Sequence, residues 1–137
     1  MPKETGTKAF RTHRPAADAR AAVVNADWGT LTWLASADAG NATGLTLGRV
    51  VIRKGQNNPR HAHPGAEEVL YLLAGKLRHT VGPDSYTLDP GDAITIPAGA
   101  FHNAVSIGDV DADMIVAYSS AQRDFVLEDT STGKSTE

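Results

Sequence analysis

The chain has 137 residues, of which 41% are apolar and 21% charged, and its formal net charge is −3. This length fits one domain with a core of its own, and the weak negative charge argues against nucleic acid or an anionic membrane as a partner. The absence of cysteine excludes disulfides, thiolate metal ligands and a cysteine nucleophile. No apolar stretch is long enough to span a bilayer and no basic-then-apolar leader opens the chain, so we expect a cytoplasmic protein.

The two ends of the chain differ in composition from its middle. Residues 1–20 carry scattered charge and show no sustained periodicity, which predicts a flexible N-terminal segment. The alanine-rich run 16–22 within it favours a single helical turn. Residues 129–137 are mostly serine, threonine, glycine and charged residues, and they are predicted to form a disordered tail. The predicted folded domain is therefore 21–128.

Short strand-like segments alternate with turns through this middle region. The predicted strands cover residues 28–35, 45–54, 69–74, 77–81, 86–88, 93–96, 102–106 and 113–119. Glycine, proline, asparagine and aspartate fill the connections between them. Because no long amphipathic helical pattern competes, this rhythm predicts an all-β sandwich or barrel.

Three of the five histidines fall in two tight settings. His61 and His63 are two residues apart, so on an extended strand their imidazoles lie on the same face. A turn at residues 64–66 then returns Glu67 or Glu68 toward them, and His102 opens a later strand. Three imidazoles and one carboxylate suit a divalent Mn, Fe, Co, Ni, Cu or Zn ion. The residues alone leave a metal site and a set of ordinary surface histidines as open alternatives.

The same residues resemble the two sequence motifs of the cupin superfamily. The first motif is Gly-x5-His-x-His, three or four residues, then Glu-x6-Gly, and it is matched by Gly55, His61, His63, Glu68 and Gly75. The second, Gly-x5-Pro-x-Gly-x2-His-x3-Asn, is matched by Gly91, Pro97, Gly99 and His102, with Ser106 in place of the closing asparagine. The short stretch between the motifs is similar to that of small, single-domain bacterial cupins.

The resemblance implies a single cupin barrel, a double-stranded β-helix or jelly roll, with one divalent transition metal inside it near one mouth. The implied metal ligands are His61, His63, Glu68 and His102. Glu67 competes with Glu68, and the six-residue count to Gly75 favours Glu68.

Four residues are candidates for the substrate pocket. Alternation along residues 69–74 puts Leu70 and Leu72 on the side of Glu68, with Val69, Tyr71 and Leu73 on the other side. Leu70 is therefore a candidate. Ser106 joins it because it lies four residues after His102, on the same strand face if no bulge intervenes, and Phe101 and Arg53 join it because they stand near the motif residues. For these three, packing or solvent exposure is the alternative. His79 either lines the barrel or faces solvent, and a surface or packing role is favoured.

The resemblance further implies a metal-dependent enzyme whose small substrate is an enol, dicarbonyl, diol or carboxylate. Dioxygenase-like chemistry is the favoured reaction. The alternatives are an isomerase, lyase, decarboxylase or cyclase that works without O₂, or a cupin that binds a small ligand without catalysis. We also expect a homodimer with residues 23–34 near its interface. Trp28 and Trp33 have opposite strand parity, so one is expected in the core and the other at that interface.

Overall fold

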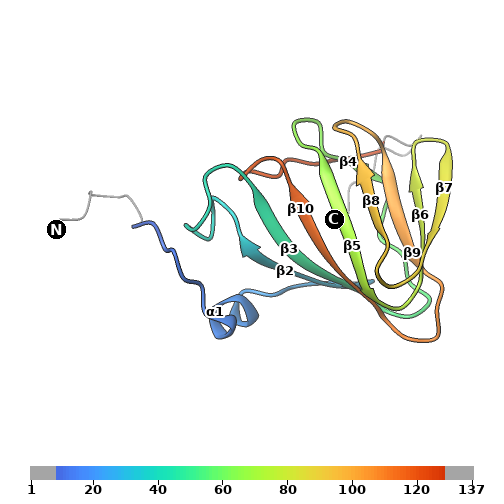
Figure 1. Ribbon diagram of the computed structural model, residues 1–137, viewed down its shortest axis with the longest axis horizontal. Helices are drawn as coiled ribbons and strands as arrows, with labels where there is room; N and C mark the ends of the chain where they lie inside the picture. Colours follow the sequence, from blue (N-terminus) through green and yellow to red (C-terminus); the bar gives the residue numbers. More distant parts are fainter. Residues whose placement is uncertain (1–8, 129–137) are drawn as a thin grey trace.

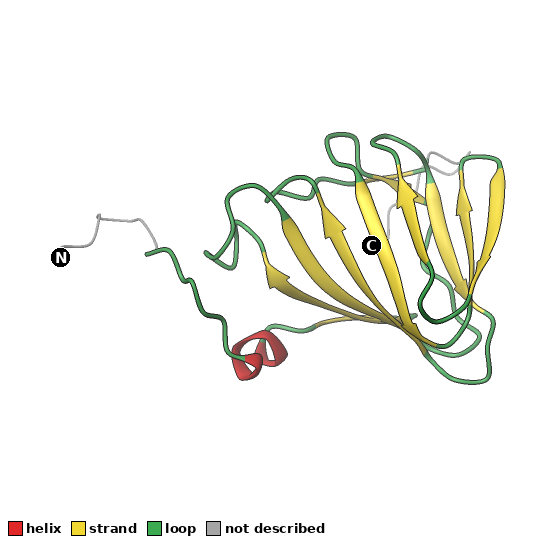
Figure 2. Cartoon of the chain, in the orientation of Figure 1, coloured by secondary structure: helices red, strands yellow, loops and turns green. Residues whose placement is uncertain are grey.

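Two antiparallel sheets face each other and form a jelly-roll barrel, as the computed structural model of residues 9–128 shows (Figures 1 and 2). The first sheet has the strand order β1-β2-β3-β10-β5-β8 and the second the order β11-β4-β9-β6-β7. The described elements are α1 Ala16–Ala21, β1 Val24–Ala26, β2 Gly29–Ala35, β3 Thr46–Ile52, β4 His61–Ala62, β5 Glu68–Ala74, β6 Leu77–Val81, β7 Asp84–Leu88, β8 Ala93–Ile96, β9 His102–Ser106, β10 Ala112–Tyr118 and β11 Val126–Leu127. The predicted all-β cupin barrel is confirmed.

The predicted strands fall on observed ones, and three of them, β6, β8 and β9, have the predicted bounds. The predicted strands do not include β1, β4 and β11, which are three, two and two residues long and too short to show alternation. The alanine-rich run forms α1, whose Ala19 is buried. The rest of the predicted flexible segment before residue 9, and the predicted tail, lie outside the described residues.

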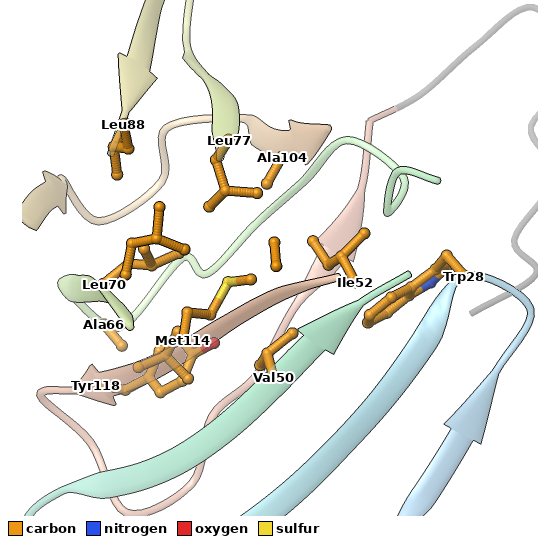
Figure 3. Packing of buried hydrophobic residues seen from close by; sticks show 13 residues of the cluster. Trp28, Val50, Ile52, Ala66, Leu70, Leu77, Leu88, Ala104, Met114 and Tyr118 are labelled. Carbon is orange, nitrogen blue, oxygen red and sulfur yellow. The ribbon is translucent and has the colours of Figure 1, made fainter. Parts of the chain in front are cut away.

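The core lies between the two sheets because each central strand buries alternate side chains. Along β10 the residues Ala112, Met114, Val116 and Tyr118 are buried, and along β5 the residues Glu68, Leu70 and Leu72 are buried. The side chains that meet in the core are seen in Figure 3, where Leu70, Met114 and Val50 of the first sheet face Leu77, Leu88 and Ala104 of the second.

Strand β5 alternates as predicted between the core and the outer surface. Leu72 is fully buried, whereas Val69, Tyr71 and Leu73 are exposed. Glu68 shares the buried face with the leucines, which is costly for a carboxylate unless other groups compensate its charge. The burial of Glu68 therefore marks the place where the core gives way to a polar site.

Gly75 allows the chain to leave β5 in the first sheet and enter β6 in the second. Its φ is +87°, and a Cβ atom there would lie 2.7 Å from the carbonyl oxygen of Asp111 and 2.8 Å from the Cα of Ala112. Only glycine combines this conformation with this close approach of the backbone.

No helix among the described residues has the length and apolar character needed to cross a membrane.

Replacing Leu72 by alanine should lower the free energy of unfolding by about 2–5 kcal/mol, because a fully buried leucine leaves a cavity behind. Leu73→Ala, one residue along the same strand and 45% exposed, is the matched control and should cost less than about 0.5 kcal/mol. Urea denaturation followed by circular dichroism measures both. Equal losses in the two variants would contradict the assignment of the two faces of β5.

Candidate metal centre

Four side chains from different elements converge where the two sheets meet. His61 lies in β4, opposite His102 at the start of β9, and His63 follows β4 directly. Glu68 begins β5, in the facing sheet. The exposed fractions are 7% for His61, 2% for His63 and His102, and 4% for Glu68. The structure thus brings together all four residues that the sequence singled out.

The distances within this cluster are short enough for one ion. One ring nitrogen from each of His61, His63 and His102 lies within 4.8 Å of the others. The Oε1 atom of Glu68 is 3.1 Å from Nε2 of His102 and 3.5 Å from Nε2 of His63. Donor atoms from four residues therefore surround one small volume.

The outer nitrogen of each imidazole is tied to the backbone. Nδ1 of His61 lies 2.7 Å from the carbonyl oxygen of Pro59, and Nδ1 of His102 lies 2.9 Å from that of Ala100. Nδ1 of His63 lies 2.9 Å from the carbonyl oxygen of Asp124. Because a carbonyl only accepts, each Nδ1 carries the proton, and Nε2 of the neutral ring presents a lone pair. This arrangement of partners is typical of metal-bound histidine.

The inner atoms of the cluster are acceptors with no donor. Nε2 of His63, Nε2 of His102 and Oε1 of Glu68 are buried, and none of them has a hydrogen-bond partner among the described residues. As long as the His102 ring is neutral, Nε2 of His102 and Oε1 of Glu68 are both acceptors, so their contact is not a hydrogen bond. Buried acceptors without partners are costly, and a cation between them removes that cost. The donor set thus fits a divalent transition metal.

Burial keeps the imidazoles of His61 and His63 neutral. It lowers the pKa of His61 from 6.5 to about 4, with a further contribution from His102, and it also lowers the pKa of His63. Burial alone would raise the pKa of Glu68, but the adjoining imidazoles, His102 foremost, outweigh it and lower that pKa. At neutral pH the cluster therefore holds a carboxylate beside the neutral rings of His61 and His63, the protonation states in which these residues bind metal.

A fourth imidazole, that of His79, stands beside this cluster. It is 2% exposed and stacks on His102, with ring centroids 5.8 Å apart and an interplanar angle of 9°. Burial lowers its pKa from 6.5 to about 4. A surface position for His79 is therefore wrong, because the ring is buried, packs on His102 and lines the cavity next to the cluster. Its parity with the core residue Leu77 in β6 was the signal in the sequence that places it inside.

A cavity of about 220 Å³ opens beside the cluster, with His61, Glu68 and His102 in its wall. Leu70 lines it, as predicted. Trp28 and Trp33 both line it too, although strand parity predicts opposite faces for them, and the expectation that one of them lies at a dimer interface stays a prediction. The bulge between Trp33 and Ala35 in β2 accompanies this break in simple alternation. The rest of the wall is mostly apolar, with Leu31, Val50, Ile52, Met114, Val116, Tyr118 and Phe125 among its residues.

Three pocket candidates from the sequence are not in this wall. Arg53 is exposed and donates to the carbonyl oxygens of Ala26 and Asp27. Phe101 is half-buried at the corner before β9. Ser106 is buried, but it ends the strand that His102 begins, and four residues of extended chain separate them by about 13 Å. Shared strand parity put Ser106 on the correct face but at the wrong depth.

Sequence reasoning missed Arg123 and Phe125. Both line the cavity, and the Phe125 ring lies 6.2 Å from the His61 ring. They belong to the irregular chain after β10, which has no periodicity or motif that assigns a direction to its side chains.

The cupin domain family model matches residues 48–118, which is more than half of the chain and contains all four clustered residues. The chain therefore belongs to the cupin domain family.

The curated relatives include a germin-like protein 3-8 from Oryza sativa, 34% identical over 85 residues that cover 58% of this chain and 38% of that protein. An auxin-binding protein ABP19b from Prunus persica is 36% identical over 85 residues, 58% of this chain and 41% of that one. The chain thus spans about two fifths of the length of these relatives. Both are plant proteins, so the particular resemblance to bacterial cupins gains no support.

The solved structures that resemble this fold include two enzymes that act on oxalate. Oxalate decarboxylase of Lactobacillus farciminis, in a formate complex, has a TM-score of 0.72 and 19% identity over 78% of this chain and 33% of that one. A recombinant oxalate oxidase in complex with glycolate has a TM-score of 0.67 and 25% identity over 91% of this chain and 62% of that one. At 19% identity, the comparison with oxalate decarboxylase shows only that the two proteins share a fold.

The metal-free protein should lose stability as the pH falls from about 6.5 to about 4. His61 and His79 have folded-state pKa values of about 4, below the ordinary 6.5, so the unfolded chain binds more protons in that interval. Each of these two histidines can lower the free energy of unfolding by up to about 3 kcal/mol over this pH interval. Urea midpoints measured between pH 7 and pH 4 test this, and His79→Gln should flatten the dependence. His13→Gln, at an exposed position, should leave it unchanged. A flat profile in the wild-type protein would contradict neutral burial.

Proposed function

We propose that the protein is a metal-dependent enzyme of small-molecule metabolism, with His61, His63, Glu68 and His102 as ligands of one divalent transition metal. The observation that carries the proposal is the convergence of three buried acceptor atoms without a donor, Nε2 of His63, Nε2 of His102 and Oε1 of Glu68. The Nδ1 atoms of both rings are hydrogen-bonded to backbone carbonyl oxygens. One carboxylate against a dication leaves the centre with a charge of +1, which favours an anionic or enolate substrate oxygen.

A bound metal of this class supplies Lewis-acid activation of a coordinated oxygen, and one that changes its oxidation state also supplies redox chemistry. The chain contributes the rest. Backbone carbonyls fix the three ligand rings, and the apolar wall excludes water from the substrate. His79 adds a neutral imidazole whose Nδ1 lies 3.1 Å from the carbonyl oxygen of Thr80, which leaves Nε2 as a proton acceptor. A second inward-facing base supports catalysis over simple binding.

The reaction that we favour is the oxidation of a small oxygenated substrate by O₂. The likeness to an oxalate oxidase, whose structure contains glycolate, supports both an oxidative reaction and a small carboxylate or related substrate. Isomerase, lyase, decarboxylase and cyclase chemistry at the same site are the alternatives. The cavity of about 220 Å³ is smaller than the roughly 300–1,000 Å³ of pockets that hold drug-sized ligands, which limits the substrate to a small molecule.

A second candidate is a protein that binds a small ligand without converting it. The observation that favours it is the auxin-binding protein among the curated relatives. Product analysis after incubation with candidate dicarbonyls, diols and carboxylates separates the two, because a binding protein returns its ligand unchanged.

The metal proposal predicts one metal ion per chain in protein purified without a metal-affinity tag, and its loss in His63→Ala. Plasma mass spectrometry measures the metal, and His13→Ala, at an exposed position, is the matched control. Iron would support O₂ chemistry, which an oxygen electrode measures as O₂ consumption. Manganese, nickel or zinc would instead favour isomerase, lyase, decarboxylase or cyclase chemistry. No metal in the wild-type protein, even after reconstitution, would overturn the proposal.

We also propose a homodimer that covers the edge of the first sheet. Strand β1 forms that edge, and Val23 and Val24 beside it are 37% and 45% exposed. Light scattering should give a mass near twice the 14.4 kDa of one chain, and Val24→Lys should shift it toward the single-chain value. A wild-type mass near 14.4 kDa would contradict the dimer.

A further inference from the structure

The chain that follows β10 crosses back over the metal centre. We call residues 119–128 the C-terminal strap; it lies outside the part of the chain that the cupin domain family model matches. Its end is held firmly: β11 pairs with β4, the backbone nitrogen of Glu128 donates to Arg60, and Nε of Arg60 lies 2.8 Å from Oε1 of Glu128. The strap therefore has a fixed position relative to the strand that carries His61.

The strap also contacts the proposed ligands directly. The carbonyl oxygen of Asp124 accepts a hydrogen bond from Nδ1 of His63 at 2.9 Å, and the Phe125 ring stands perpendicular to the His61 ring. Arg123, the residue before these two, lines the same cavity as Glu68 and His102. Its guanidinium is thus placed beside the centre by neighbours that are themselves fixed to it.

Aromatic rings hold the Arg123 guanidinium. Its central carbon lies 4.3 Å from the centroid of Trp33, 5.5 Å from that of Phe125 and 5.6 Å from that of Tyr118. Stacking on ring faces leaves the N–H groups at the edge of the plane, where they can donate to an anion in bidentate fashion. Arg11, Arg49 and Arg60, by contrast, are held by carboxylates, with N–O distances of 3.0, 2.6 and 2.8 Å.

Arg123 and Trp33 stand where the cavity meets the surface. Both also line an outer groove, whose other residues include Ser36, Gln122 and the acidic residues Asp38 and Asp124. The side chain of Arg123 therefore borders both the cavity beside the metal centre and this outer groove.

Charge and shape together define the ligand. With the proposed metal bound, the centre carries +1 and Arg123 adds a second positive charge to a wall that is otherwise mostly apolar. A small anion offsets both charges, and an apolar body fills the space lined by Trp28, Leu31 and Val50. We propose that Arg123 is a specificity-determining residue that binds the anionic group of the substrate, and that the substrate is a small carboxylate or enolate with an aromatic or branched apolar body. This inference rests on the proposed function, because it names the substrate class of the same site.

Intrinsic fluorescence tests the proposal without relying on activity, because Trp28 and Trp33 are the only tryptophans and both line the cavity. Metal-loaded and metal-free protein are titrated with benzoate, with its neutral isostere benzamide, and with oxalate. We expect benzoate to bind the loaded wild-type protein more tightly than either of the other two. Arg123→Ala should weaken benzoate at least about tenfold, the loss of hydrogen bonds to a charged group, and leave benzamide unchanged.

Arg53→Ala removes an exposed arginine outside the cavity and should bind benzoate as the wild-type protein does. Arg123→Lys, which keeps the charge and loses the bidentate geometry, should fall between wild type and Arg123→Ala. Thermal melts and metal content of each variant show that the fold and the centre persist. The proposal is overturned if Arg123→Ala binds benzoate with wild-type affinity, if benzamide binds as tightly as benzoate, or if the wild-type protein binds no benzoate at millimolar concentration. If the wild-type protein contains no metal, the proposed function is overturned. The titrations of metal-free protein then still test whether Arg123 binds the anion.

Discussion

The carboxylate of Glu68, buried among three imidazoles, is the constraint on which the site depends. A carboxylate at this depth requires compensation, and the imidazoles cannot supply it by hydrogen bonding, because their protons are committed to the carbonyl oxygens of Pro59, Asp124 and Ala100. The same commitment that leaves Glu68 without a donor leaves inner ring nitrogens without one. The fold thus holds a set of acceptors that only a cation can satisfy together, and two sheets must pack in one register to hold them.

The rest of the barrel serves this arrangement. Leu70 and Leu72 continue the buried face that Glu68 begins, so the site and the core are successive parts of the same strand face. Gly75 then lets the chain cross from the first sheet to the second, where β6 brings His79 into the cavity wall. One side of the cavity is therefore polar and preorganised and the other side apolar, a division that favours a ligand with one charged end.

Regular parts of this fold were open to prediction because alternation and motif spacing report local geometry. Residues 69–74 showed their two faces in sequence, and the spacing around His61, His63 and His102 named residues that the structure gathers. The sequence pattern does not report how far a residue lies from the site along its strand. Ser106 was therefore predicted on the correct face, but it lies at the opposite end of β9 from His102 and away from the cavity. Arg123 and Phe125 were missed because irregular chain has no period, and its side-chain directions depend on tertiary contacts with β4 and β2.

The place of β10 in the sheet has a consequence for how the protein is made. This strand lies between β3 and β5, and it is the second-last strand of the described chain. A ribosome must therefore release residues 112–118 before the β1-β2-β3 and β5-β8 parts of the first sheet can be joined, and residue 124 before His63 gains the carbonyl that orients it. Pairing that waits on distant residues is slow to form. Nascent chains will accordingly expose the apolar faces of these strands until residues 112–118 have emerged, and His63 will lack its backbone partner until residue 124 has followed.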